Sequence, residues 1–303
     1  MISIMKIIDA RKYTYTFSII LVAVSLLAFT LWGLKLGIEF TGGSLLEVEF
    51  KDNRPEGSAV EKNLKSAGLE VATPQSTGER GMILRFPDLD ESKHQTALAI
   101  LRKFGEVSEK QFTSIGPSIG AELKRNSIWA IATVIIMIVL YISWAFRKVS
   151  RPVSSWKYGI AALVALIHDV SIPVGFFSFL GYFYGITIDT LFVTALLTIL
   201  GFSVHDTIVV FDRIRENLKK IGSRENFENI VEMSLRQTIG RSINTSLTVM
   251  FVMLILFFFG GATTQYFSLA ILVGVFFGTY SSIFIASFIL VTWHKFATLE
   301  AGG

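Results

Sequence analysis

Long apolar runs alternate with charged stretches along the chain. The first run, residues 14–34, holds about 20 uncharged residues, which is enough for one helix across a bilayer. Five further runs reach spanning length, at residues 127–146, 158–183, 187–211, 245–261 and 266–293. The pattern therefore predicts a polytopic α-helical membrane protein with six transmembrane helices.

A cleaved signal peptide is the alternative for the first run. The apolar core of a signal peptide is shorter, about 7–15 residues, and it ends at a small-x-small cleavage site. The sequence from Trp32 to Lys35 has no such site. We therefore expect residues 14–34 to be retained as a membrane anchor.

Residues 38–125 depart from the membrane pattern, because they carry many charges and no apolar run of spanning length. Apolar and polar positions alternate in SLLEVEF (44–50) and again in GMILRF (81–86), as in half-buried strands. The predicted elements are a strand at 44–50, a helix near 60–67, a strand at 69–73, a strand at 81–86, a helix near 97–104 and a strand at 106–112. This order is typical of a ferredoxin-like α+β domain.

The positions of Lys and Arg orient the chain. They are concentrated before the first run, in 147–157 and in 212–244, whereas the loops 184–186 and 262–265 carry none. Because Lys and Arg favour the cytoplasmic side of a membrane, we expect both termini in the cytoplasm and residues 38–125 outside it.

Three parts follow from this orientation. A cytoplasmic N-terminus and first helix (1–37) precede the extracytoplasmic α+β domain (38–125), and the other five helices form a bundle (126–303). Apolar residues at helical spacing in the cytoplasmic loop 212–244 predict a pair of amphipathic surface helices.

Composition narrows the classes of function. Hydrophobic residues make up 51% of the chain, the mean hydropathy is +0.56, and there is no cysteine for a disulfide, a thiolate metal site or a nucleophile. The motifs HExxH, GxSxG and the P-loop are also missing. Asp169 and Asp206 could supply the aspartate pair of an intramembrane protease, but the GxGD context is missing. We expect no enzyme, no metal, no ATP or other cofactor, and no nucleic-acid partner.

Asp206 is the first candidate for function, because it lies inside an apolar run that continues to Phe211. An ionisable group at that depth costs a few kcal/mol, and it marks a proton or ion path or a paired internal charge. Arg241 opens the fifth run, and the loop before it brings the cytoplasmic halves of two helices together. We therefore expect Asp206 and Arg241 to pair, either as a proton switch or as a permanent ion pair that holds helices together.

Further polar residues lie in or beside the apolar runs. Asp169 and His168 fall near the middle of the third run, and His205 adjoins the first candidate aspartate. Asn244 and Thr248 share one face of the fifth helix. A buried structural hydrogen bond is the alternative for Asp169, and packing or interhelical hydrogen bonding is the alternative for the histidines.

Gly274 and Gly278 form a GxxxG motif in the sixth run. Small residues at this spacing let two helices approach closely in a membrane. We therefore expect a helix-packing role for both glycines.

Six segments taken together resemble the SecF family of the bacterial Sec protein-export machinery, in the resistance-nodulation-division superfamily. They are GIEFTGG (37–43), SIGPSIGAELKRNSIWA (114–130), ALIHDVSIPVG (165–175), GFSVHDTIVVFDRIREN (201–217), RSINTSLT (241–248) and GTYSSIFIAS (278–287). The resemblance spans nearly the whole chain. It departs from the family pattern at His205, where Asn is expected, and at Phe288, where Pro is frequent.

The resemblance implies one half of a pseudo-symmetric twelve-helix unit in the bacterial cytoplasmic (inner) membrane, with SecD as the other half. Proton flow into the cell would drive motion of the outer domains and promote late translocation and release of exported proteins. Asp206 and Arg241 match the aspartate and arginine that the family uses for proton transport. Implied partners are SecD, the SecYEG translocon, YajC, SecA-driven export clients and membrane lipids.

Two other functions stay open from the sequence. The chain could be a non-catalytic assembly or scaffold subunit of the translocon, with charges that only join helices. It could also be half of a small-molecule exporter of the same superfamily, although the small domain at 38–125 argues against that.

Overall fold

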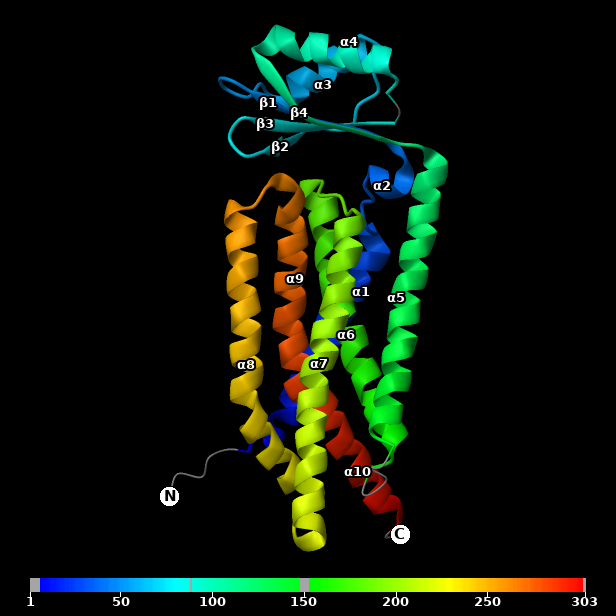
Figure 1. The fold of residues 1–303 in the computed structure, drawn as a ribbon, viewed down its shortest axis with the longest axis vertical. Coiled ribbons are helices and arrows are strands. Elements are labelled where there is room, and N and C mark those ends of the chain that lie inside the picture. Colours follow the sequence, from blue (N-terminus) through cyan, green and yellow to red (C-terminus); the bar gives the residue numbers. More distant parts are fainter. Residues whose placement is uncertain (1–5, 88, 148–152, 302–303) are drawn as a thin grey trace. The chain divides into compact units, whose positions relative to one another are not determined.

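A computed structural model describes residues 6–87, 89–147 and 153–301 (Figure 1). The chain divides into two compact units, each described here by itself. The helical unit comprises residues 1–33, 130–180 and 191–303, and the sheet unit comprises residues 34–129 and 181–190.

Six helices in the described chain are long and apolar enough to cross a membrane, which confirms the predicted membrane architecture. The helical elements are η1 (Ile7–Ala10), α1 (Arg11–Trp32), α5 (Pro117–Ala145), α6 (Ser155–Tyr184), α7 (Thr190–Ile221), η3 (Gly222–Arg224), α8 (Phe227–Phe259), α9 (Ala262–Ser281), η4 (Ser282–Ala286) and α10 (Ser287–Ala301). The sixth span runs through α9, η4 and α10, and η4 is a π-helical turn. π-helical turns are rare in proteins, but those that occur are often found at functional sites.

The sheet unit has the predicted order of elements. Its elements are α2 (Ile38–Thr41), β1 (Gly43–Phe50), α3 (Gly57–Ser66), β2 (Gln75–Thr77), β3 (Gly81–Phe86), α4 (Glu91–Leu101), η2 (Arg102–Phe104) and β4 (Val107–Ile115). The strands lie in the order β2-β3-β1-β4, all neighbours are antiparallel, and α3 and α4 cover one face (Figure 1). This is the ferredoxin-like arrangement.

The alternation in β1 explains this packing. Leu46, Val48 and Phe50 are buried, whereas Glu47 and Glu49 are partly exposed, so one face of the strand meets the helices. Leu46 lies opposite Leu84 of β3, and both side chains are fully buried.

The strand predicted at 69–73 is wrong, because β2 begins at Gln75. Leu69 and Val71 alternate as predicted, and both are buried in the core of the sheet unit. They are nevertheless not part of a strand, and the backbone near them is tied to β3 by one bond, from the Ala72 N–H to the Arg85 carbonyl (2.9 Å). Alternating burial therefore arises here without regular strand pairing.

The predicted pair of surface helices in 212–244 is also wrong. α7 continues to Ile221 and α8 begins at Phe227, so both segments extend spanning helices. Gly222 ends α7 with φ +61°, and the Asn226 side chain caps α8 by accepting from the Asn229 N–H (2.8 Å). Phe227 and its apolar neighbours are buried in the core of the helical unit rather than lying on a surface.

Two acidic side chains of the sheet unit, Glu39 and Glu49, should make folding stability change with pH in opposite directions. Burial raises the pKa of Glu39 above 4.5 and the Asp189 charge adds to this, whereas a hydrogen bond from Lys110 and its charge lower the pKa of exposed Glu49 below 4.5. Folded protein therefore binds the Glu39 proton more tightly than unfolded protein, so this contribution to stability falls as pH rises from 4.5 through the raised pKa. Glu49 contributes stability that is lost as pH falls below 4.5.

Glu39→Gln should therefore become more stable than the parent chain as pH rises above 4.5. Glu49→Gln is the matched control and should approach the parent's stability as pH falls below 4.5. Thermal unfolding of the full chain across a pH series measures both. Parallel pH profiles for the two variants would contradict this reading.

Candidate functional site

Asp206 lies at the contact between α7 and α8. Its side chain is 6% exposed, and its Oδ1 accepts a hydrogen bond of 2.6 Å from the Ser242 hydroxyl. Oδ2 is buried and has no hydrogen-bond partner in the described part of the chain. An unsatisfied buried polar atom is costly, so a carboxylate oxygen in this position is suited to accept a proton.

Arg241 does not form the predicted ion pair with Asp206 in the described residues. Neighbouring residues on a helix point about 100° apart, so Arg241 and Ser242 start from different sides of α8. Ser242 faces the carboxyl, and Arg241 is exposed.

Arg241 instead lines a charged cavity of about 400 Å³ between α7 and α8. The remaining lining residues are Ile208, Val209, Asp212, Arg213, Glu216, Gln237 and Thr238. Asp206, Val209 and Arg213 repeat at helical spacing along one side of α7. The cavity therefore lies on the same side of α7 as the buried carboxyl, and the Arg241 guanidinium is part of its lining.

Polar contacts hold the two walls of this cavity together. Arg213 Nε donates to Gln237 Oε1 (2.7 Å), and Asn217 Nδ2 donates to Gln237 Oε1 and to Ser234 Oγ (both 2.9 Å). These bonds all join α7 to α8, so they fix the spacing of the helices that carry Asp206 and Arg241.

Asp169 forms a second polar centre, on α6. Its side chain is 0% exposed, and it joins three segments of the bundle. Oδ1 contacts His168 Nδ1 (2.9 Å), whereas Oδ2 accepts from the hydroxyls of Ser203 on α7 and Ser281 on α9, the latter at 2.8 Å. A carboxylate with hydrogen bonds on both oxygens is well satisfied despite its burial.

Hydroxyl groups extend from this centre. Ser282 donates to the Ser203 carbonyl (3.2 Å) and is hydrogen-bonded to Thr207, the neighbour of Asp206 in the sequence (2.8 Å). On the other side of α9, Ser246 of α8 is hydrogen-bonded to Thr279. Polar contacts therefore run from Asp169 on α6 through α7 and α9 to α8.

The other candidate residues divide into two groups. His168 is buried beside Asp169, whereas His205, Asn244 and Thr248 are exposed in the isolated chain. His205 and the two polar residues of α8 are therefore not brought into the buried clusters.

Gly274 and Gly278 lie where α9 approaches α7. A Cβ atom on Gly274 would overlap the side chain of Ile199, and one on Gly278 would lie 3.3 Å from Ser203 Cβ. Both positions therefore need a small residue, as expected for close helix contact.

The hydroxyl residues were not predicted as functional. Ser242 and Ser246 lie four residues apart, as do Ser203 and Thr207, so each pair shares one face of its helix. That spacing inside apolar runs is the signal that could have identified them, together with the aspartate near the second pair.

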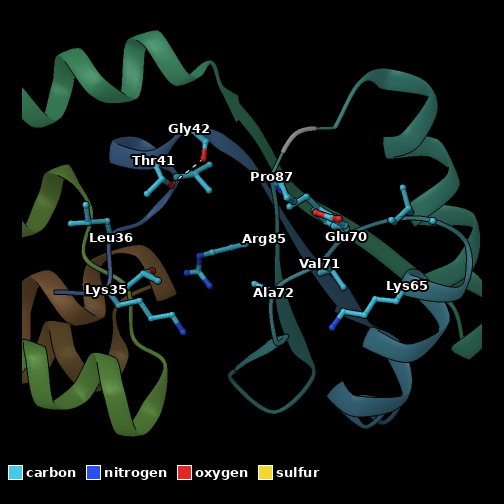
Figure 2. A pocket seen from close by; sticks show the side chains of 15 residues that line it. Lys35, Leu36, Thr41, Gly42, Lys65, Glu70, Val71, Ala72, Arg85 and Pro87 are labelled. Carbon is cyan, nitrogen blue, oxygen red and sulfur yellow. Dashed lines mark hydrogen bonds between the residues drawn. The ribbon is translucent and has the colours of Figure 1, made fainter. Parts of the chain in front are cut away.

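A separate cavity of about 990 Å³ lies in the sheet unit. Figure 2 shows Lys35, Lys65 and Arg85 among its labelled lining side chains, with apolar residues such as Val71 between them. Arg85 donates to Gln75 Oε1 (2.6 Å), and Gln75 donates in turn to the Gly185 carbonyl. The cavity is therefore amphipathic and chemically distinct from the carboxylate clusters.

Six candidate membrane helices in the described chain, with buried carboxylates and an inserted α+β unit, define a polytopic membrane protein. The family model for the C-terminal part of the SecD/SecF protein-export membrane proteins matches residues 96–296, and the SecD/SecF GG motif matches residues 33–53. The chain belongs to the SecD/SecF family. Among the described residues, no group of three His, Asp or Glu side chains is placed to hold a metal ion.

Similar proteins support this assignment over nearly the full length. Protein translocase subunit SecF of Thermobaculum terrenum is 47% identical over 304 residues, which cover 95% of this chain and 94% of the relative. Protein translocase subunit SecDF of Bacillus subtilis is 35% identical, over 93% of this chain but 37% of the relative. The crystal structure of SecDF from Thermus thermophilus has a TM-score of 0.84 and 30% identity; the match covers 97% of this chain and 40% of that one.

Proposed function

We propose that the chain is a subunit of the accessory complex of Sec protein export, and that it pairs with SecD. The match to SecF of Thermobaculum terrenum covers 94% of that relative, whereas the matches to the SecDF chains cover 37% and 40% of theirs. A partner equivalent to that remaining length would complete the bundle and cover polar groups of α7 and α8 that are exposed in the isolated chain, such as His205 and Arg241.

The proposed setting is the bacterial inner membrane, with both termini in the cytoplasm and residues 38–125 outside. The distribution of Lys and Arg supports this orientation. The SecYEG translocon, YajC and SecA-driven clients are the proposed partners, and the proton gradient, rather than ATP bound by this chain, is the proposed energy source.

The single observation that carries the proposal is the buried Asp206 carboxyl. One oxygen is held by Ser242 and the other has no partner, beside a charged cavity lined by Arg241. A proton taken up on Oδ2 neutralises the group, and the charge-assisted bond from Ser242 becomes a weaker neutral one. The contact between α7 and α8 therefore depends on whether the proton is bound.

The available energy is sufficient for such a switch. Moving one charge across 100 mV is worth about 2.3 kcal/mol, which biases a conformational equilibrium roughly fifty-fold. Charge neutralisation in turn would shift the packing of α7, which begins at Thr190, where the 181–190 segment of the sheet unit ends.

A purely structural scaffold is the second candidate function. It requires polar contacts that hold helices together, such as the hydrogen bonds that Ser203 and Ser281 donate to Asp169. Asp206 has no ion-pair partner in the described residues, and its buried Oδ2 has no hydrogen-bond partner there, which favours the proton switch.

The proposal is tested in inverted membrane vesicles that contain the translocon, SecD and this chain. Release of an exported protein should accelerate when a proton gradient is imposed and fall to the level of chain-depleted vesicles when a protonophore collapses it. The expected loss is about tenfold or more, because one proton supplies a roughly fifty-fold bias. Release that depends on this chain but not on the gradient would support the scaffold instead.

A further inference from the structure

We propose that Asp169 and His168 form a second proton-binding site, in series with Asp206. This inference rests on the proposed function, since it adds a second proton-binding site to the same proton path. It is carried by the geometry around Asp169, a side chain that is fully buried and bonded from three sides.

His168 is the entrance to the proposed site. Its side chain is 4% exposed, Nδ1 faces Asp169 Oδ1 at 2.9 Å, and Nε2 is buried with no hydrogen-bond partner in the described part of the chain. A structural histidine would be expected to satisfy both nitrogens, because an unpaired buried group costs about 1–3 kcal/mol. The open Nε2 therefore points to a position where a proton or a water molecule is received.

The proton balance of the step is simple. A proton arrives at Nε2 of the neutral imidazole, and the proton on Nδ1 passes to Asp169 Oδ1 along the 2.9 Å contact. The imidazole is then neutral again in its other tautomer, and the carboxylate has become a carboxylic acid. No other reactant is needed, since proton transfer by a positioned histidine is ordinary acid–base chemistry.

The surroundings of the pair are uncharged except for the first proton site. On α9, Tyr280 lies against the His168 ring with centroids 6.0 Å apart, and its hydroxyl donates to the Thr14 carbonyl of α1 (3.1 Å). On α7, the titratable residues that follow Ser203 in the sequence are His205, which is exposed, and the buried Asp206. Asp169 forms no ion pair with a Lys or Arg in the described residues. No such cation therefore opposes protonation of its carboxylate.

Protonation of Asp169 would act on two helices at once. Ser203 on α7 and Ser281 on α9 both donate to Oδ2, and bonds to an ionised carboxylate are roughly twice as strong as those to a neutral acid. Neutralising Asp169 therefore loosens both contacts together. Ser282, the next residue after Ser281, opens the π-helical turn η4 and contacts Thr207 beside Asp206.

The π-helical turn η4 lies between the contacts of the two carboxyls. Such turns interrupt regular α-helix and are frequent at functional sites. Because η4 starts between the hydroxyl that binds Asp169 and the one that binds Thr207, a change at the first carboxyl reaches the neighbour of the second. Protonation of Asp169 and protonation of Asp206 are thus coupled rather than independent.

The test uses the chain co-purified with SecD in lipid nanodiscs and records infrared difference spectra across a pH series. The carboxylic acid bands should contain separate contributions that disappear in Asp169→Asn and in Asp206→Asn, and both should disappear in the double variant. In vesicles, Asp169→Asn should reduce gradient-driven release at least tenfold. A spectrum that Asp169→Asn leaves unchanged, with the Asp206 contribution still present, would reject the second site while the proposed function stands. Loss of both contributions together with gradient-independent release would reject the proposed function itself.

A second pair of variants keeps the test decisive if Asp169→Asn does not assemble. Ser281→Ala removes one donor from the carboxyl and should displace the Asp169 band in frequency and in midpoint pH. Ser268→Ala is the matched control, because Ser268 is a buried hydroxyl of α9 that donates only to the Thr264 carbonyl of its own helix (2.8 Å). Identical bands in the two serine variants would overturn the inference.

Discussion

Asp206→Asn is expected to abolish gradient-driven release of exported protein while the chain still assembles with its partner. The amide oxygen of asparagine can accept the Ser242 hydroxyl as Oδ1 does now, so the α7–α8 contact is kept. An amide does not take up a proton at neutral pH, so the whole bias of about fifty-fold from one charge crossing 100 mV should be lost. Release rates with and without an imposed gradient measure the effect.

The matched control is Glu225→Gln. Glu225 lies in the turn between α7 and α8, where its Oε2 accepts from Asn229 Nδ2 (2.9 Å), and the glutamine oxygen can accept the same bond. This variant makes the same change of charge at an exposed position, so its release should equal that of the parent chain. Full gradient-driven release in Asp206→Asn would exclude this carboxyl from the proton path.

Most helices and strands could be predicted because they leave a strong local pattern in the sequence. Six apolar runs of spanning length are confirmed as six candidate membrane helices, and the alternation in 44–50 and 81–86 is confirmed as β1 and β3. The boundaries failed where no local signal existed. Nothing in 212–244 separates a surface helix from the end of a spanning one, because both carry apolar residues at helical spacing.

It was much harder to predict which side of each membrane helix is turned toward its neighbours. A helix that meets lipid on one side and protein on the other is apolar on both, so its periodicity carries little information. Asp206 could be identified as buried from its place in an apolar run, but the sequence does not say which residue of α8 turns toward it. Ser242 rather than Arg241 holds that position, a difference of one residue and about 100° around the helix.

Gly175→Ala should destabilise the helical unit strongly, because α1 and α6 touch through their backbones at this glycine. A Cβ atom there would overlap Ser25, including its main-chain Cα and carbonyl oxygen, which cannot move aside as a flexible side chain could. Overpacking of this kind typically costs about 1–3 kcal/mol, and Gly175→Leu should cost more. Thermal unfolding of the purified full chain in detergent measures the loss.

Gly201→Ala is the matched control for that measurement. Gly201 lies inside α7, and a Cβ atom there would meet nothing within 4 Å. Replacing glycine by alanine inside a helix is favourable by about 0.8–1.0 kcal/mol when no contact opposes it, so this variant should be as stable as the parent or more so. The same intrinsic gain applies at Gly175, so the difference between the two variants isolates the backbone contact between α1 and α6. Equal stability of the two variants would mean that these helices do not approach as closely as the structure places them.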